Sequence, residues 1–358
     1  MLTPPVVIAT TPIAAGPEND FFTPIPFMNS LTSRGAGRVW ALLVAVFLVG
    51  CAQVPQSVPP LPQTPQQPQQ PQQPPASVSL PNTGAGVPLP VPVQEKKVAR
   101  IGLALGGGAA RGFAHVGVIQ ALEEAGIRPE LVAGTSAGSL VAALYASGKN
   151  SAQLKKVADS MEEAEITDWM IPILNRGALR GEALARYVHT QVGGLPIEQM
   201  KIPLGIVATD LQSGEPMLFR RGSTGTAVRA SSAVPGVFQP VRLGNREYVD
   251  GGLVAPVPVH QAREMGANFV IAVDISSDPE GNAATDTFQI LMQTFTIMGK
   301  SINHYGLKDA NLVVRPALTG VKSADFTARR RSIEAGHAAM QKLIPRLREL
   351  LAQFEAGR

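Results

Sequence analysis

The stretch Ile101-Gly102-Leu103-Ala104-Leu105-Gly106-Gly107-Gly108 sets the architecture of the folded part of this chain. Its apolar first half is typical of a strand that is buried on both faces of a sheet. The glycines lead into a predicted helix through Ala125, with Val116, Ile119 and Leu122 on its apolar side. A strand, a loop and a helix in this order predict the beginning of a parallel βαβ unit.

The next elements continue that unit. A short predicted strand, Leu131-Val132-Ala133, runs into Gly134-Thr135-Ser136-Ala137-Gly138, and a predicted helix follows from Ser139 to Ser147. Further strands are predicted at Leu204–Ala208, Arg246–Val249 and Phe269–Val273, with a helix at Val259–Met265. The sequence therefore predicts an α/β fold of three layers, α/β/α, in which helices cover both faces of a central, mainly parallel sheet.

The end of the chain, from Ser332 to Phe354, is predicted to be helical. Its apolar side comprises Ile333, Met340, Ile344, Leu347 and Leu351. Pro345 falls inside this stretch, so we expect a kink or a break there. We expect the helix to pack on the domain, with a helix lying on a membrane as the alternative.

The beginning of the chain has the pattern of a secretory signal. Arg34 and Arg38 precede the apolar run Trp40–Val49, which ends at Gly50-Cys51. The run is too short to span a bilayer comfortably, and a small residue lies at its end. Met28 would begin a signal of normal proportions, so we expect residues 1–50 to comprise a signal peptide and a spurious N-terminal extension.

Cys51 is the single cysteine, so it can form no intrachain disulfide. The ending Leu48-Val49-Gly50-Cys51 resembles the bacterial lipobox, in which the thiol is diacylated and the chain is cut just before it. A plain signal anchor with an incidental cysteine is the alternative. Ala52 follows instead of Asp, which in a Gram-negative cell favours the outer membrane. We therefore expect a lipid-anchored protein of the bacterial envelope.

Residues 51–98 are expected to form the lipidated cysteine and a tether, because the Pro/Gln-rich tract from Gln53 to about Gln94 cannot build a core. A Pro-rich ligand for a peptide-binding module is the alternative. The folded domain is expected to cover residues 99–358.

The net charge is +4, and no Lys/Arg-dense stripe with interleaved aromatic residues occurs, so we expect no nucleic-acid partner. Weak attraction to anionic phospholipid head groups fits this charge better.

The motif Gly134-x-Ser136-x-Gly138 lies between a predicted strand and a predicted helix, which is the context of a nucleophile elbow. Such a turn strains the serine and exposes its hydroxyl. Side chains two residues to each side would collide with the neighbouring backbone, hence the two glycines. The N-terminus of the helix offers free N–H groups to a developing anion. A structural turn is the alternative, and we favour catalysis.

The glycine loop at 106–112 admits three interpretations. A phosphate-binding P-loop would need Gly-Lys-Ser/Thr, but Arg111-Gly112 supplies neither the lysine nor the hydroxyl. A dinucleotide fingerprint would need glycine where Arg111 stands. The third interpretation is an oxyanion hole made by the backbone N–H groups of Gly106, Gly107, Gly108 and Ala109. The nearby elbow serine favours the third.

Asp250-Gly251-Gly252 follows a predicted strand, and parallel α/β sheets bind their ligands at the carboxyl ends of strands. Asp-Gly-Gly alone is usually only a turn. Together with the glycine loop at 106–112 and Gly134-Thr135-Ser136-Ala137-Gly138, it resembles the motif set of the patatin-like phospholipases. Residues 230–238, Ala-Ser-Ser-Ala-Val-Pro-Gly-Val-Phe, are similar to the segment that precedes the aspartate motif in that family. The C-terminal stretch is similar to the bacterial branch related to neuropathy target esterase.

The resemblance implies a role for each motif. Ser136 would be the nucleophile, Asp250 its base and residues 106–109 the oxyanion hole. Arg111 would position that loop or bind phosphate. The family contains esterases and A-type phospholipases, and the resemblance implies neither a metal nor another cofactor.

A serine–aspartate dyad is chemically reasonable because desolvation raises the pKa of a carboxylate and makes it a better proton acceptor. A Ser–Asp–His triad is the rival, since His260 and His304 both follow Asp250 in the chain order of such a triad. His260 adjoins a predicted helix start, where a lone histidine is more often structural, and His115 has the same interpretation.

We expect an acyl hydrolase acting on phospholipids, lysophospholipids or related long-chain esters at the membrane. The alternatives are a non-catalytic lipid-binding lipoprotein of the envelope and a broad carboxylesterase acting on soluble esters. The sequence identifies no protein partner.

Overall fold

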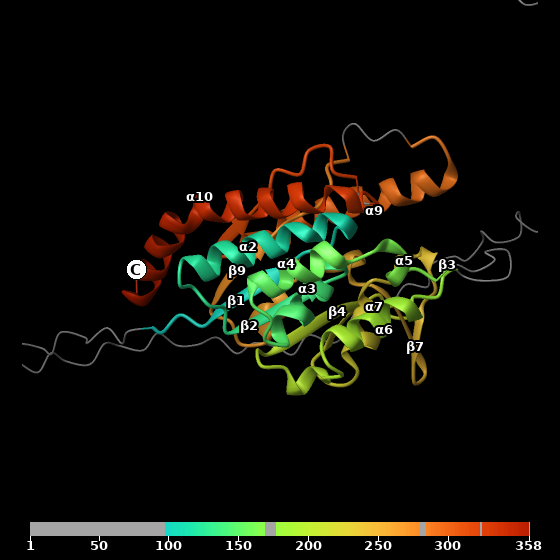
Figure 1. The fold of residues 1–358 in the computed structure, drawn as a ribbon, viewed down its shortest axis with the longest axis horizontal. Helices are drawn as coiled ribbons and strands as arrows, with labels where there is room; N and C mark the ends of the chain where they lie inside the picture. Colours follow the sequence, from blue (N-terminus) through green and yellow to red (C-terminus); the bar gives the residue numbers. More distant parts are fainter. Residues whose placement is uncertain (1–96, 169–176, 280–283, 323, 358) are drawn as a thin grey trace, which may run out of the picture. The chain divides into compact units, whose positions relative to one another are not determined.

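The computed structural model describes residues 97–168, 177–279, 284–322 and 324–357 (Figure 1). The expected signal segment, Cys51 and nearly all of the Pro/Gln-rich tether lie outside the described residues. Within the described part of the chain, no helix is both long and apolar enough to cross a membrane.

The centre of the fold is a sheet of eight strands. They are β1 (Ile101–Leu105), β2 (Leu131–Thr135), β4 (Leu204–Asp210), β5 (Pro216–Phe219), β7 (Val241–Leu243), β8 (Arg246–Asp250), β9 (Phe269–Val273) and β10 (Leu312–Val314). Their order is β10-β9-β1-β2-β4-β8-β7, and β5 also pairs with β4. The pairs from β10 to β4 are parallel, whereas β4 pairs with β5 and β8, and β8 with β7, in antiparallel fashion.

Strands β2 and β8 meet end to end along one edge of β4. Thr135, the last residue of β2, pairs with Val207, and Asp250, the last residue of β8, pairs with the next residue, Ala208. Strand β5 spans residues 206–209 of β4 and therefore occupies the opposite edge. Strand β8 ends at Asp250, as predicted, but it runs antiparallel to β4, unlike the parallel strands whose carboxyl ends usually bind ligands. The carboxyl ends of β2 and β8 nevertheless face each other.

Helices cover both faces of the sheet, as predicted. On one face lie α2 (Phe113–Glu124), α3 (Ala137–Ala146), α4 (Ser151–Ser160) and α10 (Arg329–Glu355), and on the other α8 (Val259–Glu264). The remaining elements are α5 (Glu163–Ile166), α6 (Glu182–Gln191), α7 (Thr224–Ser231), α9 (Thr287–Gly306), the 3-10 turns η1 (Ala109–Gly112), η3 (Ile197–Gln199), η4 (Gly251–Leu253), η5 (Leu307–Asp309) and η6 (Phe326–Ala328), and a small sheet of β3 (Gly177–Leu179) with β6 (Gly236–Phe238). The fold is a three-layer α/β/α arrangement with a mostly parallel sheet.

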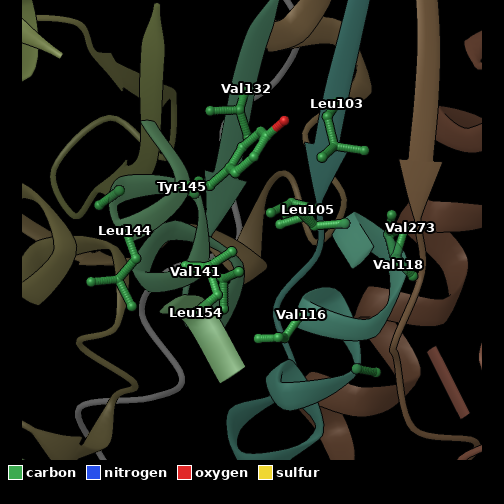
Figure 2. Packing of buried hydrophobic residues seen from close by; sticks show 14 of the residues in the cluster. Leu103, Leu105, Val116, Val118, Val132, Val141, Leu144, Tyr145, Leu154 and Val273 are labelled. Carbon is green, nitrogen blue, oxygen red and sulfur yellow. The ribbon is translucent and has the colours of Figure 1, made fainter. Parts of the chain in front are cut away.

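Alternation along the strands divides the core into two layers. Leu103 and Leu105 of β1 pack toward α2 and α3, whereas Ala104 packs toward α8. Figure 2 shows residues of the first layer, among them Leu103 and Leu105 of β1, Val118 of α2 and Tyr145 of α3. Small residues on the second face let α8 lie close to the sheet.

Helices α2 and α10 pack closely because each contributes a glycine to the contact. A Cβ on Gly117 would lie 1.9 Å from the carbonyl oxygen of Ile333, and one on Gly336 would lie 1.9 Å from that of Ala114. Only hydrogen fits at either position. The C-terminal helix thus packs on the domain, as we expected.

Of the kink or break expected at Pro345, the break is wrong, because α10 is continuous across it. Pro345 and Gln341, whose carbonyl loses its helical partner, both lie on the exposed side of the helix. Met340 and Leu347 are fully buried and hold both halves of α10 to the domain.

Candidate active site

Ser136 occupies a strained turn between β2 and α3. Its φ of 52° and ψ of −125° lie in a region that L-residues rarely adopt. A Cβ on Gly134 would lie 2.4 Å from the carbonyl oxygen of Gly138, and one on Gly138 would lie 2.1 Å from that of Leu105. These contacts confirm the steric reason predicted for the two glycines of the elbow. The strain leaves the Ser136 side chain at the start of α3 and partly exposed.

Asp250 accepts a hydrogen bond from Ser136. The serine Oγ lies 2.6 Å from Asp250 Oδ2, and the backbone N–H of Gly252 donates to Oδ1 at 2.7 Å. The Asp250 side chain is buried, and burial raises its pKa from 3.8 to about 6, against the lowering effect of these two hydrogen bonds. A carboxylate with this pKa is mostly ionised at neutral pH, and it accepts a proton more readily than an exposed aspartate would.

Glycine after the aspartate is required by the strand junction. A Cβ on Gly251 would lie 2.2 Å from the carbonyl oxygen of Val207 and 3.1 Å from Thr135 Cγ2. Thr209 Oγ1 donates to the Asp250 carbonyl at 2.8 Å, which holds β8 at the junction. The register of β8 on β4 therefore places the carboxylate beside the elbow.

Ser231, at the end of α7, is part of the site although our sequence reasoning gave it no role. Its Oγ accepts a hydrogen bond from the backbone N–H of Ser136 at 2.8 Å and donates one to the Val207 carbonyl at 2.5 Å. This buried hydroxyl fixes the elbow to β4. It lies in the segment 230–238 that we singled out, but only the folded chain shows its partner.

The glycine loop contributes fewer free N–H groups than we expected. The N–H of Gly106 donates to the Val273 carbonyl at 3.1 Å, and that of Gly107 to the Pro256 carbonyl at 2.9 Å. These two N–H groups maintain the loop, so the prediction that they form part of an oxyanion hole is wrong. The N–H groups of Gly108 and Ala109 have no acceptor among the described residues. Gly107 itself lies against the elbow, since a Cβ there would be 3.1 Å from Ser136 Cβ.

Arg111 is buried and faces away from the elbow. Its guanidinium donates to Ser277 Oγ and, at 2.5 Å, to the Ser276 carbonyl, both in the segment after β9. It therefore positions the loop, which agrees with one of the two predicted roles; these contacts do not involve phosphate. Gly112 packs against α3, because a Cβ there would lie 2.8 Å from Ala137 Cβ.

His115 also supports the loop. Burial lowers its pKa to about 4, so the imidazole is neutral, and in the tautomer with hydrogen on Nε2 it donates to the Gly106 carbonyl at 2.8 Å. The structural interpretation of His115 is thus confirmed. His260 and His304 are both exposed, and no histidine among the described residues hydrogen-bonds to Ser136 or Asp250.

An apolar cavity of about 250 Å³ opens beside Ser136. Its walls come from the glycine loop and η1, from α2, α3 and α4, and from the segment before β6. They include Ala109, Phe113, Val116, Ser136, Leu140, Leu144, Leu154, Met161, Val234, Phe238 and Phe326. Almost the whole lining is hydrocarbon, so the cavity suits an aliphatic chain better than a polar group. No cluster of His, Cys, Asp or Glu that could hold a metal ion occurs in the part of the chain that the structure describes.

Residues 103–263 match the family model described as patatin-like phospholipase. An uncharacterized NTE family protein of Mycobacterium tuberculosis is 38% identical over 197 residues, which cover 55% of this chain and 54% of the relative. Human patatin-like phospholipase domain-containing protein 6 is 35% identical over 52% of this chain and 14% of its own length. The match thus spans about half of the mycobacterial relative and a small part of the human one.

Two solved structures are similar to this chain. VipD from Legionella pneumophila superposes with a TM-score of 0.45 and 15% identity, covering 70% of this chain and 67% of VipD. The type III effector protein ExoU superposes with a TM-score of 0.40 and 16% identity, covering 72% and 53%.

Proposed function

Since residues 103–263 form a patatin-like phospholipase domain, we propose that this chain is a serine acyl hydrolase that uses Ser136 and Asp250 as a catalytic dyad. The observation that carries the proposal is the 2.6 Å hydrogen bond from Ser136 Oγ to Asp250 Oδ2 at the wall of an apolar cavity. The strained elbow and the desolvated carboxylate together provide a nucleophile and its base.

The first half of the reaction acylates Ser136. As its oxygen attacks the ester carbonyl, the hydroxyl proton passes to Asp250 Oδ2. Charge then develops on the carbonyl oxygen, which we place at the N–H groups of Gly108, Ala109 and Ala137, the last at the N-terminus of α3. Asp250 returns the proton to the departing alcohol, and the acyl group stays on Ser136.

The second half hydrolyses the acyl-enzyme. Asp250 accepts a proton from water, the hydroxide attacks the acyl carbonyl, and the proton returns to Ser136 as the fatty acid leaves. Each proton that moves is exchanged between substrate, water, Ser136 and Asp250. A histidine is not needed, and both carboxylate oxygens of Asp250 already have donors, Ser136 and Gly252.

The apolar cavity supports a long acyl chain as the part of the substrate that is bound beside Ser136. We therefore propose phospholipids, lysophospholipids or related long-chain esters as substrates. A broad carboxylesterase would need no cavity of this kind for small soluble esters. A lipid-binding protein without activity would need neither the strained serine nor its buried partner.

The lipid anchor at Cys51 and a location on the outer membrane belong to the same proposal. They rest on the sequence from Arg34 to Ala52 alone. A tether between Cys51 and the domain would keep the catalytic site near its substrate.

Lipid hydrolysis by the purified chain, compared with its Ser136→Ala variant, tests the proposal. We expect wild type to release fatty acid from phospholipid or lysophospholipid and a fluorophosphonate probe to label Ser136. The variant should do neither while it keeps its circular dichroism spectrum. Labelling of another serine, or equal release by the variant, would refute the dyad.

A further inference from the structure

Helix α9 presents an apolar surface that nothing else in the described chain covers. Every exposed large apolar side chain among the described residues, other than Val98 and Leu211, lies on this helix. These side chains are Phe288, Ile290, Leu291, Ile297, Met298 and Tyr305. Only Asn303 of α9 is buried. Figure 1 shows α9 in orange beyond the start of α10. Exposed apolar patches of this kind mark binding surfaces.

The exposed side chains follow the period of a helix. Ile290 and Ile297 are seven residues apart, as are Leu291, Met298 and Tyr305, so each set lies along one side of α9. The opposite side holds the helix to the domain. There, Asn303 hydrogen-bonds to the segment after β9, and Gly299 lies close to Pro256. Ile297, Met298 and Tyr305 are therefore directed away from the domain, whereas Leu291 at the start of the helix also reaches Gly236.

This surface adjoins the wall of the catalytic cavity. Phe288 and Leu291 lie 3.7 and 3.6 Å from the position that a Cβ on Gly236 would take. Gly236 stands between Val234 and Phe238, which both line the cavity. The apolar face of α9 thus continues from the neighbourhood of the cavity to the surface of the molecule.

The charges on α9 fit a lipid head-group layer. The helix itself contains no Asp or Glu; Asp286 caps its start, Lys300 pairs with Asp278 at 3.0 Å, and Lys308 follows its end. Lys308 Nζ lies 4.9 Å from the centre of the exposed ring of Tyr305, a pair that suits the boundary between head groups and acyl chains. A helix with an apolar side, a lysine at one end and too little hydropathy to span a bilayer suits the plane of the interface.

We propose that α9 binds the surface of a phospholipid bilayer, with its apolar face among the upper parts of the acyl chains. When α9 is bound in this way, the neighbouring cavity lies against the membrane, and a lipid can pass from the membrane into the cavity. The inference deepens the proposed function, on which its purpose rests. Binding itself requires no catalysis.

The helix is also connected to the glycine loop. Asn303 Nδ2 donates to Ser276 Oγ at 2.8 Å, and the carbonyl of Ser276 accepts from Arg111 Nη2 at 2.5 Å. Arg111 belongs to η1, which follows Gly108 and begins at Ala109. The membrane-binding surface and the loop are therefore held to the same segment, which fixes the height of the site above the bilayer.

Vesicle binding by the full chain tests the proposal. Cys51→Ser is introduced throughout, so that no acyl anchor contributes. Ile290→Ser/Ile297→Ser removes two exposed apolar side chains of α9, and Val98→Ser/Leu211→Ser removes two elsewhere as a matched control. On vesicles of phosphatidylcholine with a minority of phosphatidylglycerol, we expect the α9 variant to bind roughly tenfold more weakly. The control should bind like the parent.

A second measurement reads the contact directly. With Cys51 replaced, Ile297→Cys or Leu211→Cys gives the chain a single thiol for an environment-sensitive fluorophore. The emission should rise and shift to shorter wavelength on vesicles for the label at position 297, and stay unchanged for the label at 211. This signal does not depend on any loss of stability in a serine variant.

Several outcomes would overturn the inference. These are a parent chain that does not bind the vesicles, an α9 variant that binds equally well, or a control that loses as much affinity. Equal responses of the two labels would do the same. Sedimentation tests the alternative that α9 binds a second copy of the chain. If the parent is a dimer that does not bind vesicles, and Ile290→Ser/Ile297→Ser converts it to a monomer, the surface is a dimer interface. Hydrolysis of a soluble short-chain ester is measured in parallel, so that failure of the proposed function is distinguished from failure of vesicle binding.

Discussion

Ser136 and Asp250 are 114 residues apart in the chain, yet the serine Oγ donates a hydrogen bond to the carboxylate at 2.6 Å. Each residue ends or follows a strand, and both strands pair with β4. Because Thr135 and Asp250 pair with consecutive residues of β4, the nucleophile and its partner are positioned by one strand. Their geometry is therefore as rigid as the sheet.

Replacing the carboxylate should distinguish a dyad from a triad. Asp250→Asn is expected to lower the rate by several orders of magnitude, because Ser136 loses its proton acceptor. His260→Ala and His304→Ala should each retain most of the rate, since both side chains are exposed. Steady-state kinetics on one ester substrate, with circular dichroism as the folding control, measures the difference. A histidine variant as impaired as Asp250→Asn would establish a triad.

The pKa of Asp250 predicts a pH dependence of rate and stability. The rate should rise with pH through about 6, because the ionised carboxylate is the base. Stability should change in the opposite direction. Burial raises the pKa of Asp250 in the folded chain above its unfolded value of 3.8. The contribution of this group to the free energy of unfolding is therefore fully present below about pH 3.8 and is lost as the pH rises through about 6. At about 1.4 kcal/mol per pKa unit the loss is about 3 kcal/mol.

Urea unfolding of wild type and Asp250→Asn measures that loss. The variant has no carboxylate to ionise at this position. Its free energy of unfolding should therefore rise relative to that of wild type between about pH 4 and about pH 8. A difference that does not vary with pH would contradict the raised pKa.

Two substitutions of the nucleophile should differ in stability. Ser136→Ala removes the hydroxyl but keeps a side chain at φ 52°, whereas Ser136→Gly also relieves the backbone strain. Both should be inactive. The glycine variant should be more stable than the alanine variant by about 1–3 kcal/mol, less the greater entropy that glycine has in the unfolded chain. Thermal unfolding of the pair tests this order, and equal stability would mean that the elbow stores no strain.

The contact between α2 and α10 predicts a severe effect of one methyl group. Gly117→Ala should destabilise the domain by about 3 kcal/mol or more, because the new Cβ would meet the backbone oxygen of Ile333 at 1.9 Å. Gly306→Ala at the end of α9 is the matched control, since its Cβ would meet nothing within 4 Å. The control should be neutral or slightly stabilising. Similar melting temperatures for both variants would show that the helices can separate without cost.

The proposed anchor predicts a change in processing. Cys51→Ser should abolish incorporation of labelled palmitate in a bacterial host and release or misprocess the protein, because the thiol is the only acceptor of its kind in the chain. Incorporation is followed by gel electrophoresis of cells grown with the label. Equal labelling of both forms would contradict the lipoprotein proposal.

Local patterns predicted the parts of the site that local geometry determines. The elbow could be predicted because strand, glycine spacing and helix are contiguous from Leu131 to Ser147. The free N–H groups of the loop could not, since the acceptors that occupy Gly106 and Gly107 are Val273 and Pro256, both far along the chain. The same holds for Ser231, whose partners appear only when α7 packs on β4.

Sheet direction was also beyond a local pattern. The residues of β8 predict a strand, but nothing within them indicates that the strand runs antiparallel to β4. Pro345 illustrates the opposite case: a strong local signal indicates a kink or a break, and packing keeps the helix continuous. Met340 and Leu347 hold both halves of α10, and the lost hydrogen bond lies on the exposed side of the helix.

The end-to-end junction of β2 and β8 has a consequence for how the chain acquires its chemistry during folding. A slip of β8 by two residues would keep each side chain on its own face of the sheet but would move the carboxylate by about 7 Å, out of reach of the serine. Partly folded chains therefore cannot have a fraction of the activity. If the proposed hydrolase meets a membrane while it is still unfolded, it is harmless to that membrane until β8 has paired with β4 in the native register. Recovery of fluorophosphonate labelling during refolding should accordingly lag behind the recovery of helical circular dichroism.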